Sequence, residues 1–108
     1  MIFGPPRHNP AMPEPRLRDA TAADFPRIVA LNAAEVAHTS PMDAARLAFL
    51  HAAACLHRVA TVDGEVVGFL LVFRDGATYP NPNFDWFAAR YPSFLYVDRV
   101  VVDAQASG

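Results

Sequence analysis

An Asp63-Gly64 pair lies between two segments rich in β-forming residues, and it is the feature of this chain that most constrains its fold. Asp-Gly tolerates the positive φ angles of a two-residue type I′ turn, which joins neighbouring antiparallel strands. The pair therefore predicts a β-hairpin. The second arm, residues 66–73, is almost wholly apolar, which is typical of a central strand covered on both faces. Gly68 interrupts that arm and indicates a bulge or the close approach of another backbone.

A short strand and a helix are predicted ahead of the hairpin. The strand covers residues 16–20, and apolar residues then recur at three- and four-residue spacing over residues 25–38. Pro26 must lie in the first turn of this helix, because deeper inside the helix it would remove a hydrogen bond. Asp24 is therefore a better helix cap than Thr21.

A second helix is predicted to begin within a residue of Pro41. Ser40 is the expected N-cap, and Pro41 suits the first helical position because its missing N–H costs nothing there. Asp43 at the third position completes a variant of the capping box. The expected buried stripe of this helix consists of Leu47, Leu50 and Ala54.

The rest of the chain predicts a short helix, capped by Asn83 and ending before Pro92, and then a strand from about Phe94 to Asp103. Strict alternation puts Phe94, Tyr96, Asp98, Val100 and Val102 on one face of that strand, and Leu95, Val97, Arg99 and Val101 on the other. The order of elements predicts an α+β domain with a mixed, mostly antiparallel sheet flanked by helices.

The chain has 108 residues, enough for one domain with its own core and too few for two. Residues 1–15 hold five of the ten prolines and no apolar period, so we expect a disordered lead, with Met12 as an alternative start, before a domain at residues 16–108. The net charge of −2 favours neither nucleic acid nor an anionic membrane as a partner. A single cysteine, Cys55, and the lack of a long apolar run predict a cytoplasmic protein.

Three segments, in this order, resemble the GNAT superfamily of N-acetyltransferases. Its first strand and helix are similar to "RLRDATAADFPRIVALN", its second and third strands to "VATVDGEVVGFLLV", and its fourth strand with the acetyl-CoA loop to "LYVDRVVVDAQASG". The aromatic residues 84–91 resemble an insert of bacterial members. The resemblance covers about residues 16–108 and implies a GNAT-like acyl-CoA N-acyltransferase fold that is incomplete at its carboxyl end.

This resemblance implies transfer of an acetyl group from acetyl-CoA, as co-substrate, to a primary amine of a small molecule or protein, with no metal. It also implies that the main chain of Val100, Val101 and Val102 pairs with the pantetheine arm of acetyl-CoA. Ser107 and Gly108 would open the loop that binds the pyrophosphate, although Ser107 departs from the Gln or Arg of the family pattern. Small residues there let backbone N–H groups turn toward phosphate.

Asp98 is the catalytic residue that the resemblance implies. A carboxylate on an apolar strand is costly unless it is paired, hydrogen-bonded or protonated. Several GNAT enzymes carry a carboxylate on this strand that accepts a proton from the incoming amine. The alternative is a structural ion pair between Asp98 and an arginine such as Arg58 or Arg90.

The resemblance also places the acceptor site near the two segments around residues 33–41 and 78–92. The residues expected to bind substrate are Asn32, Tyr79, Trp86 and Tyr91, with Phe84 as a further part of the aromatic wall. An aromatic cluster at this spacing is also typical of a core. Asn32, a polar residue on an apolar helix face, would either bind substrate or satisfy a backbone group.

A metal site at His51, Cys55 and His57 is not expected. A further ligand at matching spacing is missing, and His57 begins a strand that should point elsewhere. The sequence also lacks the G-x-S-x-G of serine hydrolases and any phosphate-binding glycine loop of a nucleotide-binding protein.

A non-catalytic GNAT-like fragment or interaction module is the competing hypothesis. A chain that ends at Gly108 would hold half a cofactor site, so we expect the 108-residue protein to be inactive and to bind no measurable acetyl-CoA. The last strand would expose an apolar face and a sheet edge, which favours a homo-oligomer. The coding sequence after Gly108 separates the hypotheses, since a glycine loop and helix would indicate the enzyme and a stop codon would exclude a stand-alone one.

Overall fold

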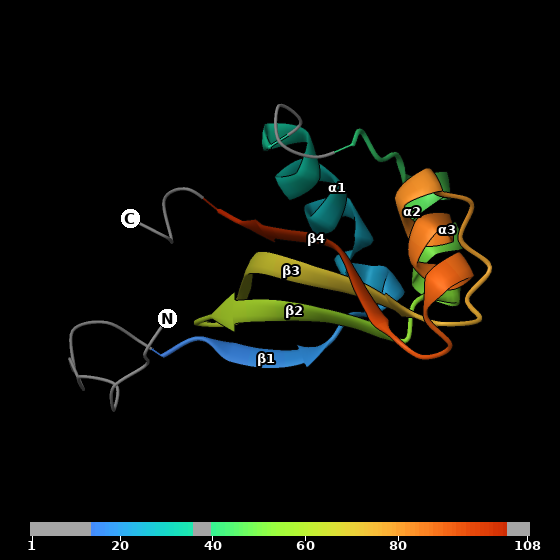
Figure 1. The fold of residues 1–108 in the computed structure, drawn as a ribbon. Coiled ribbons are helices and arrows are strands. Elements are labelled where there is room, and N and C mark those ends of the chain that lie inside the picture. The colour runs from blue at the N-terminus through green and yellow to red at the C-terminus, as the bar shows by residue number, and fades with distance from the viewer. Residues whose placement is uncertain (1–13, 36–39, 104–108) are drawn as a thin grey trace.

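The computed structural model describes residues 14–35 and 40–103, so most of the expected lead lies outside the described residues. A short strand, β1 (Arg16–Asp19), is followed by a 3-10 turn, Ala22–Asp24, and two helices, α1 (Phe25–Ala34) and α2 (Ala44–Ala53). The hairpin β2 (Leu56–Val62) and β3 (Glu65–Arg74), helix α3 (Pro82–Arg90) and strand β4 (Leu95–Val102) complete the order. This is the predicted order of elements, and the α+β class is confirmed (Figure 1).

The sheet has the strand order β1-β2-β3-β4, and every neighbouring pair is antiparallel. The turn between β2 and β3 confirms the hairpin prediction, because Asp63 and Gly64 have φ angles of 53° and 79°. The parallel component expected of a mixed sheet is not found among the described strands, since each of the three pairings runs antiparallel.

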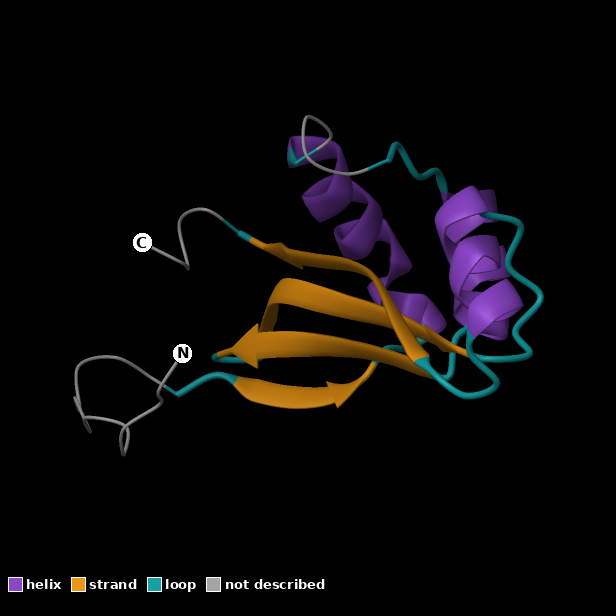
Figure 2. Ribbon diagram, in the orientation of Figure 1, coloured by secondary structure: helices purple, strands orange, loops and turns teal. Residues whose placement is uncertain are grey.

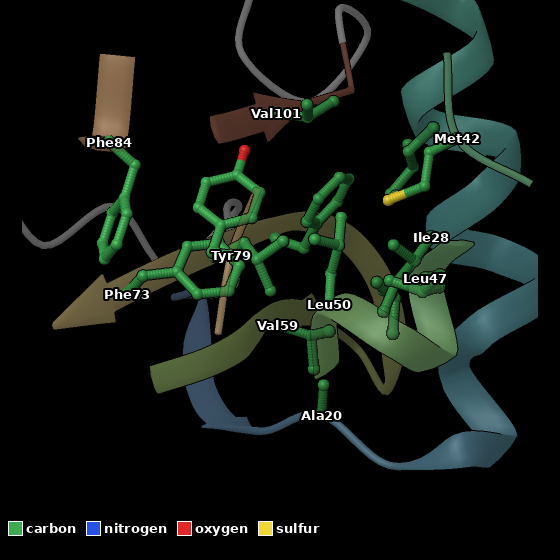
Figure 3. Packing of buried hydrophobic residues seen from close by; sticks show 14 residues of the cluster. Ala20, Ile28, Met42, Leu47, Leu50, Val59, Phe73, Tyr79, Phe84 and Val101 are labelled. Atoms are coloured by element: carbon green, nitrogen blue, oxygen red, sulfur yellow. The ribbon is translucent and has the colours of Figure 1, made fainter. Parts of the chain in front are cut away.

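The core lies between one face of the sheet and the helices, which gather on that side (Figures 1 and 2). Leu47 and Leu50 of α2 are fully buried and belong to the same cluster as Val59 of β2 and Leu71 of β3, as predicted for the stripe of the second helix. The cluster, drawn in Figure 3, comprises Ala20, Ile28, Leu31, Met42, Leu47, Leu50, Val59, Val66, Phe69, Leu71, Phe73, Tyr79, Phe84 and Val101.

The opposite face of the sheet is the outer face, and no described helix covers it (Figure 2). Leu17 of β1 and Val100 of β4 are 70% and 62% exposed there, and Leu70 of β3 is half-buried. The prediction that β3 is covered on both faces is therefore wrong within the described residues. Its apolar sequence fits a central position between β2 and β4, where Phe69, Leu71 and Phe73 belong to the core cluster. On its outer face Val72 is buried and Leu70 half-buried with no described helix over them.

Two predicted helix caps are wrong by a few residues. Helix α2 begins at Ala44 and not at Pro41, because the carboxylate of Asp43 accepts a hydrogen bond from the N–H of Arg46 at 2.7 Å and makes Asp43 the N-cap. Helix α3 is capped by Asn81 and not by Asn83, since the Asn81 side chain accepts from the N–H of Asn83 and of Phe84. The predicted end of α3 before Pro92 is confirmed.

Helix α1 follows the 3-10 turn directly and ends at Ala34, with Glu35 as its C-cap, so the prediction that it runs to about His38 is wrong. Position 38 itself lies outside the described residues. Asp24 occupies the N-cap position but does not cap α1. Its carboxylate instead accepts from the N–H of Thr21 and from the Arg18 guanidinium, at 2.9 and 2.7 Å. Thr21 and Asp24, the two predicted caps, therefore form a capping box with each other in the preceding 3-10 turn.

The prediction that Gly68 marks a bulge or the close approach of another backbone is confirmed. The register with β2 shifts beside it, because Ala60 pairs with Gly68 while Thr61 pairs with Val66. A Cβ atom on Gly68 would also lie 2.9 Å from the carbonyl oxygen of Val101 in β4. Glycine is required here by close approach of the neighbouring backbone.

Strand β4 contains a second bulge. Arg99 pairs with Leu71, but the next residue of β3, Val72, pairs with Val97. Asp98 is therefore an extra residue with no partner on β3, and it lies near the middle of an edge strand.

The bulge overturns the predicted faces of β4. Alternation puts Val100 and Val102 on the face of Tyr96, yet Tyr96 packs against the core while Val100 and Val102 are exposed on the outer face. Arg99 and Val101 take the buried positions instead. One inserted residue shifts a period of two by one position, so every side chain beyond it changes face.

Candidate functional site

Asp98 lies at the centre of a buried polar network. Its Oδ2 atom accepts a hydrogen bond from Nε of Arg99 at 2.6 Å, and its Oδ1 atom accepts from the hydroxyl of Tyr79. The side chains of Asp98 and Arg99 are 5% and 7% exposed. Asp98 is thus in an ion pair, as one of the two hypotheses predicts, but the partner is Arg99 and neither Arg58 nor Arg90.

The two arginines expected as partners of Asp98 have other contacts. Arg58 forms an ion pair with Asp19 at 3.4 Å on β1. The Arg90 guanidinium lies 4.0 Å from the centroid of the Trp86 ring, and it also donates to the carbonyl oxygen of Trp86.

Arg99 links β4 to α1 and to the residues before α2. Its Nη1 atom donates to Oδ1 of Asn32 and to the carbonyl oxygen of Ser40, both at 3.0 Å. The Nδ2 atom of Asn32 donates to the same Ser40 oxygen at 2.9 Å. Asn32 is fully buried, and its amide oxygen and its amide nitrogen both form hydrogen bonds within the protein. It therefore satisfies a backbone group, which is the second of its two predicted roles.

Tyr79 joins the network from the segment between β3 and α3. Its ring stacks on Phe73 with centroids 4.1 Å apart, and its hydroxyl points away from Phe73 toward β4 (Figure 3). Burial, and then the hydrogen bond to Asp98, raises the pKa of Tyr79 above its ordinary value. Tyr79 therefore stays protonated at neutral pH and acts as a hydrogen-bond donor to the carboxylate.

The predicted aromatic wall is divided in two. Tyr79 and Phe84 are buried in the core, whereas Trp86 and Tyr91 are exposed and lie beside Phe87 on the surface of α3 and its end. Of the four residues predicted to bind substrate, the structure brings Asn32 and Tyr79 into the network around Asp98 and Arg99. Trp86 and Tyr91 form a separate surface cluster.

The main chain of β4 presents an open edge beyond the bulge. The N–H of Asp103 donates to the carbonyl oxygen of Val67 at 2.7 Å, and alternate residues of an antiparallel strand turn their polar groups to opposite sides. The main chain of Val101 therefore faces β3, while that of Val100 and Val102 faces away. Of the three residues predicted to pair with acetyl-CoA, two offer free backbone groups in the described structure. Ser107 and Gly108 lie outside the described residues.

His51, half-buried, and His57, buried, form a second polar cluster, and the expectation that His57 points elsewhere is wrong. Their Nδ1 atoms lie 2.8 Å apart, because His57 occupies an inward position on β2 beneath the last turn of α2. Burial first, and then the nearby His51, lowers the pKa of His57 to about 4. Phe25 and Phe69 pack around the His57 ring.

Cys55 is exposed beyond the end of α2, and its thiol donates to the carbonyl oxygen of Val72. Residues 14–35 and 40–103 bring together no group of three or more His, Cys, Asp and Glu side chains that could hold a metal ion. Within the same ranges, no helix is long and apolar enough to cross a bilayer.

Sequence reasoning missed Arg99 and Asn81. Alternation puts Arg99 on the face opposite Asp98, so it is not a candidate partner, and the bulge that brings the two side chains together depends on pairing with β3. Asn81 caps α3 and donates from Nδ2 to the Tyr79 hydroxyl at 3.3 Å, which fixes the segment that carries Tyr79.

The arrangement combines an anchored carboxylate with an open strand edge two residues away. The carboxylate of Asp98 can accept a proton, and the outward main chain of Val100 and Val102 can bind an amide-bearing chain as a strand would. A scan against protein-family models, a search of the curated proteins and a search of the solved structures each found no match to this chain.

Proposed function

We propose that this domain is an N-acetyltransferase of GNAT type that transfers an acetyl group from acetyl-CoA to a primary amine. One observation carries the proposal: the bulge in β4 holds Asp98 inside the domain and leaves the main chain of Val100 and Val102 on the open edge. A proton acceptor and a strand edge therefore lie within two to four residues of each other. The order of strands and helices supports the same family.

The residues of this chain would divide the chemistry between them. An outward N–H of Val100 or Val102 would donate to the thioester carbonyl oxygen, which gains negative charge as the amine attacks. Asp98 would take the proton that the amine nitrogen loses when its bond to the carbonyl carbon forms and the carbon–sulfur bond breaks. Acetyl-CoA supplies the acetyl group, and CoA leaves as the thiolate, which can take up a proton from water.

Tyr79 and Arg99 would act as positioning residues. Each binds one oxygen of the Asp98 carboxylate, and Arg99 is itself fixed by Asn32 and by the carbonyl oxygen of Ser40. The amine would approach from the segments around Ser40 and Tyr79, which the network ties to β4. This fits the regions that the resemblance implies for the acceptor.

A second candidate function is a non-catalytic interaction module. It is favoured by the same contacts, because both Asp98 oxygens already accept hydrogen bonds and the side chain is only 5% exposed, so an incoming amine finds no free carboxylate oxygen. Its binding surface would be the open edge of β4 and the outer face.

The test measures CoA release and CoA binding in the 108-residue chain and in the chain extended along the coding sequence past Gly108. The extended chain is expected to release CoA thiol from acetyl-CoA when primary amines are added, and the 108-residue chain to bind no measurable acetyl-CoA by calorimetry. Asp98→Asn should lower the rate about a hundredfold or more. Asp85→Asn, in the first turn of α3, is the matched control and should leave the rate unchanged.

The outcomes separate the two functions. Absence of both CoA release and CoA binding in the extended chain would exclude the acetyltransferase and leave the interaction module. Micromolar acetyl-CoA binding by the 108-residue chain would overturn the prediction that this chain alone binds no measurable acetyl-CoA. An equal rate for Asp98→Asn and Asp85→Asn would remove Asp98 from the catalytic role.

A further inference from the structure

The side chain of Arg27 joins three elements of the fold. Arg27 lies in the first turn of α1, and its Nε atom donates to the carbonyl oxygen of Val66 in β3 at 3.0 Å. Its Nη2 atom donates to Oδ2 of Asp103, the residue that follows β4, at 2.9 Å. Arg27 therefore connects the start of α1 with the start of β3 and with the end of β4.

Helix α1 alone does not explain an arginine at this position. The amino-terminal end of a helix carries a partial positive charge, so a cation in the first turn is repelled. The first turn of α1 holds no acidic residue that would offset this repulsion. The compensating groups lie outside the helix, since Asp103 supplies a carboxylate and Val66 a carbonyl oxygen. The contacts of Arg27 with the two strands therefore account for its place.

Apolar packing of β4 against the helices ends one residue before the strand does. Val101 belongs to the core cluster, whereas Val102 is 45% exposed. A cavity of about 270 Å³ lies between α1 and this part of the strand, and Arg27, Val102 and Asp103 are among its lining residues. Polar contacts take over here: the N–H of Asp103 donates to the carbonyl oxygen of Val67, and its carboxylate accepts from Arg27.

We propose that Arg27 is a positioning residue for acetyl-CoA, because its ion pair with Asp103 fixes the main chain of Val102 where it binds the acyl donor. The inference rests on the proposed function, in which this main chain faces away from β3 and toward acetyl-CoA. Val102 and Asp103 share a peptide bond, so movement of one displaces the other. A binding group that is already fixed in place pays less ordering entropy when the ligand binds.

An ion pair that only stabilises the fold is the alternative. The side chains of Arg27 and Asp103 are 38% and 26% exposed, so solvent partly screens their attraction. The pair of Arg18 and Asp24 is a matched comparison, because its atoms lie 2.7 Å apart and Arg18 is 45% exposed. It joins β1 to the 3-10 turn, and β1 is the strand at the opposite edge of the sheet from β4. Loss of either pair affects stability, but only loss of Arg27 should affect acetyl-CoA binding.

Calorimetry of acetyl-CoA binding tests the proposal in the chain extended along the coding sequence past Gly108. Arg27→Met keeps an apolar stem but removes the guanidinium, and it should weaken binding about five- to tenfold. Arg27→Lys keeps the charge but lacks the planar fork that reaches both acceptors, so it should recover part of the loss. Arg18→Met is the matched control and should leave the dissociation constant within about twofold of the original.

Amide hydrogen exchange of the same proteins without acetyl-CoA gives a second readout. Arg27→Met should speed exchange of the Asp103 N–H relative to Arg18→Met, because that N–H donates to Val67 beside the lost ion pair. Circular dichroism verifies that each variant is folded. Asp103→Asn, which removes the charge from the other side of the pair, replaces Arg27→Met if that variant does not fold.

The outcomes separate this inference from the proposed function. If the extended chain binds acetyl-CoA but Arg27→Met binds it equally well, or Arg18→Met weakens binding as much, Arg27 has no positioning role and the acetyltransferase stands. Unchanged exchange at Asp103 in Arg27→Met would also overturn the role. Absence of acetyl-CoA binding in the unsubstituted extended chain would overturn both.

Discussion

His51 and His57 meet through their Nδ1 atoms, 2.8 Å apart, where α2 packs on β2. Each neutral imidazole carries one proton, so this contact is a hydrogen bond only if one ring donates and the other accepts. Nε2 of His57 is buried without a hydrogen-bond partner among the described residues. A proton there would be an unsatisfied buried donor, which favours the tautomer with the proton of His57 on Nδ1, donated to His51.

Acid should destabilise the protein through this pair. The pKa of His57 is about 4 in the folded state, against 6.5 for an ordinary histidine, so the unfolded state binds more protons between these values. The free energy of unfolding should fall by roughly 3 kcal/mol as the pH drops from about 6.5 to about 4. Urea unfolding at a series of pH values measures this slope, and His57→Gln should abolish most of it.

Asp24→Asn is the matched control for the histidine variant. The Arg18 guanidinium first, and then the N–H of Thr21, holds the pKa of Asp24 well below its usual range against the opposing effect of burial. Its contribution is present above pH 4 and is lost only as the pH falls further. Asp24→Asn should therefore keep a slope between pH 6.5 and 4 and make it slightly larger near pH 4, because the charge of Asp24 raises the pKa of His57. If His57→Gln keeps that slope as well, the buried pair is not its origin.

The ion pair of Asp98 and Arg99 should be costly to break from one side. Arg99→Met would leave a buried carboxylate with Tyr79 as its remaining partner, and we expect a loss of about 3–5 kcal/mol in the free energy of unfolding. The double variant Asp98→Asn with Arg99→Met should lose less than Arg99→Met alone. Urea unfolding of the single variants and the double variant measures the free energy of unfolding of each, which together form a double-mutant cycle for the pair.

Arg58→Met provides the comparison for the buried pair. Arg58 and Asp19 lie 3.4 Å apart but are 45% and 82% exposed, so solvent screens their attraction. Its loss should cost less than about 1 kcal/mol. Similar losses for Arg58→Met and Arg99→Met would contradict a structural role for the Asp98 network.

Local patterns predicted the elements of this fold, and long-range contacts decided the details of the site. Asp63-Gly64 fixes its turn within two residues, so the hairpin was predictable. Which side chains of β4 lie on which face was not predictable, because the bulge at Asp98 depends on pairing with β3. The partner of Asp98 was missed for the same reason. The meeting of His51 and His57 likewise requires the packing of α2 on β2, which neither segment encodes alone.

The start of α2 offers a direct test of one such correction. Asp43→Ala removes the carboxylate that accepts from the N–H of Arg46 and should cost about 1 kcal/mol in the free energy of unfolding. Ser40→Ala should cost almost nothing, because Ser40 contributes its main-chain carbonyl, which binds Asn32 and Arg99 whatever its side chain. Thermal unfolding of both variants measures the difference, and a larger loss for Ser40→Ala would restore Ser40 as the cap.

Gly68→Ala should loosen β4 from β3. The added Cβ would lie 2.9 Å from the Val101 carbonyl oxygen, which is backbone and can yield only if the strands separate, so a loss of about 1–3 kcal/mol is expected. Gly64→Ala has free space but a φ of 79°, so it strains the turn without touching β4. Amide hydrogen exchange distinguishes the two: relative to the Gly64→Ala protein, Gly68→Ala should speed exchange of the Asp103 N–H, which donates to Val67 beside the clash. Equal exchange at Asp103 in both variants would mean that the close approach of β3 and β4 is not what requires glycine at position 68.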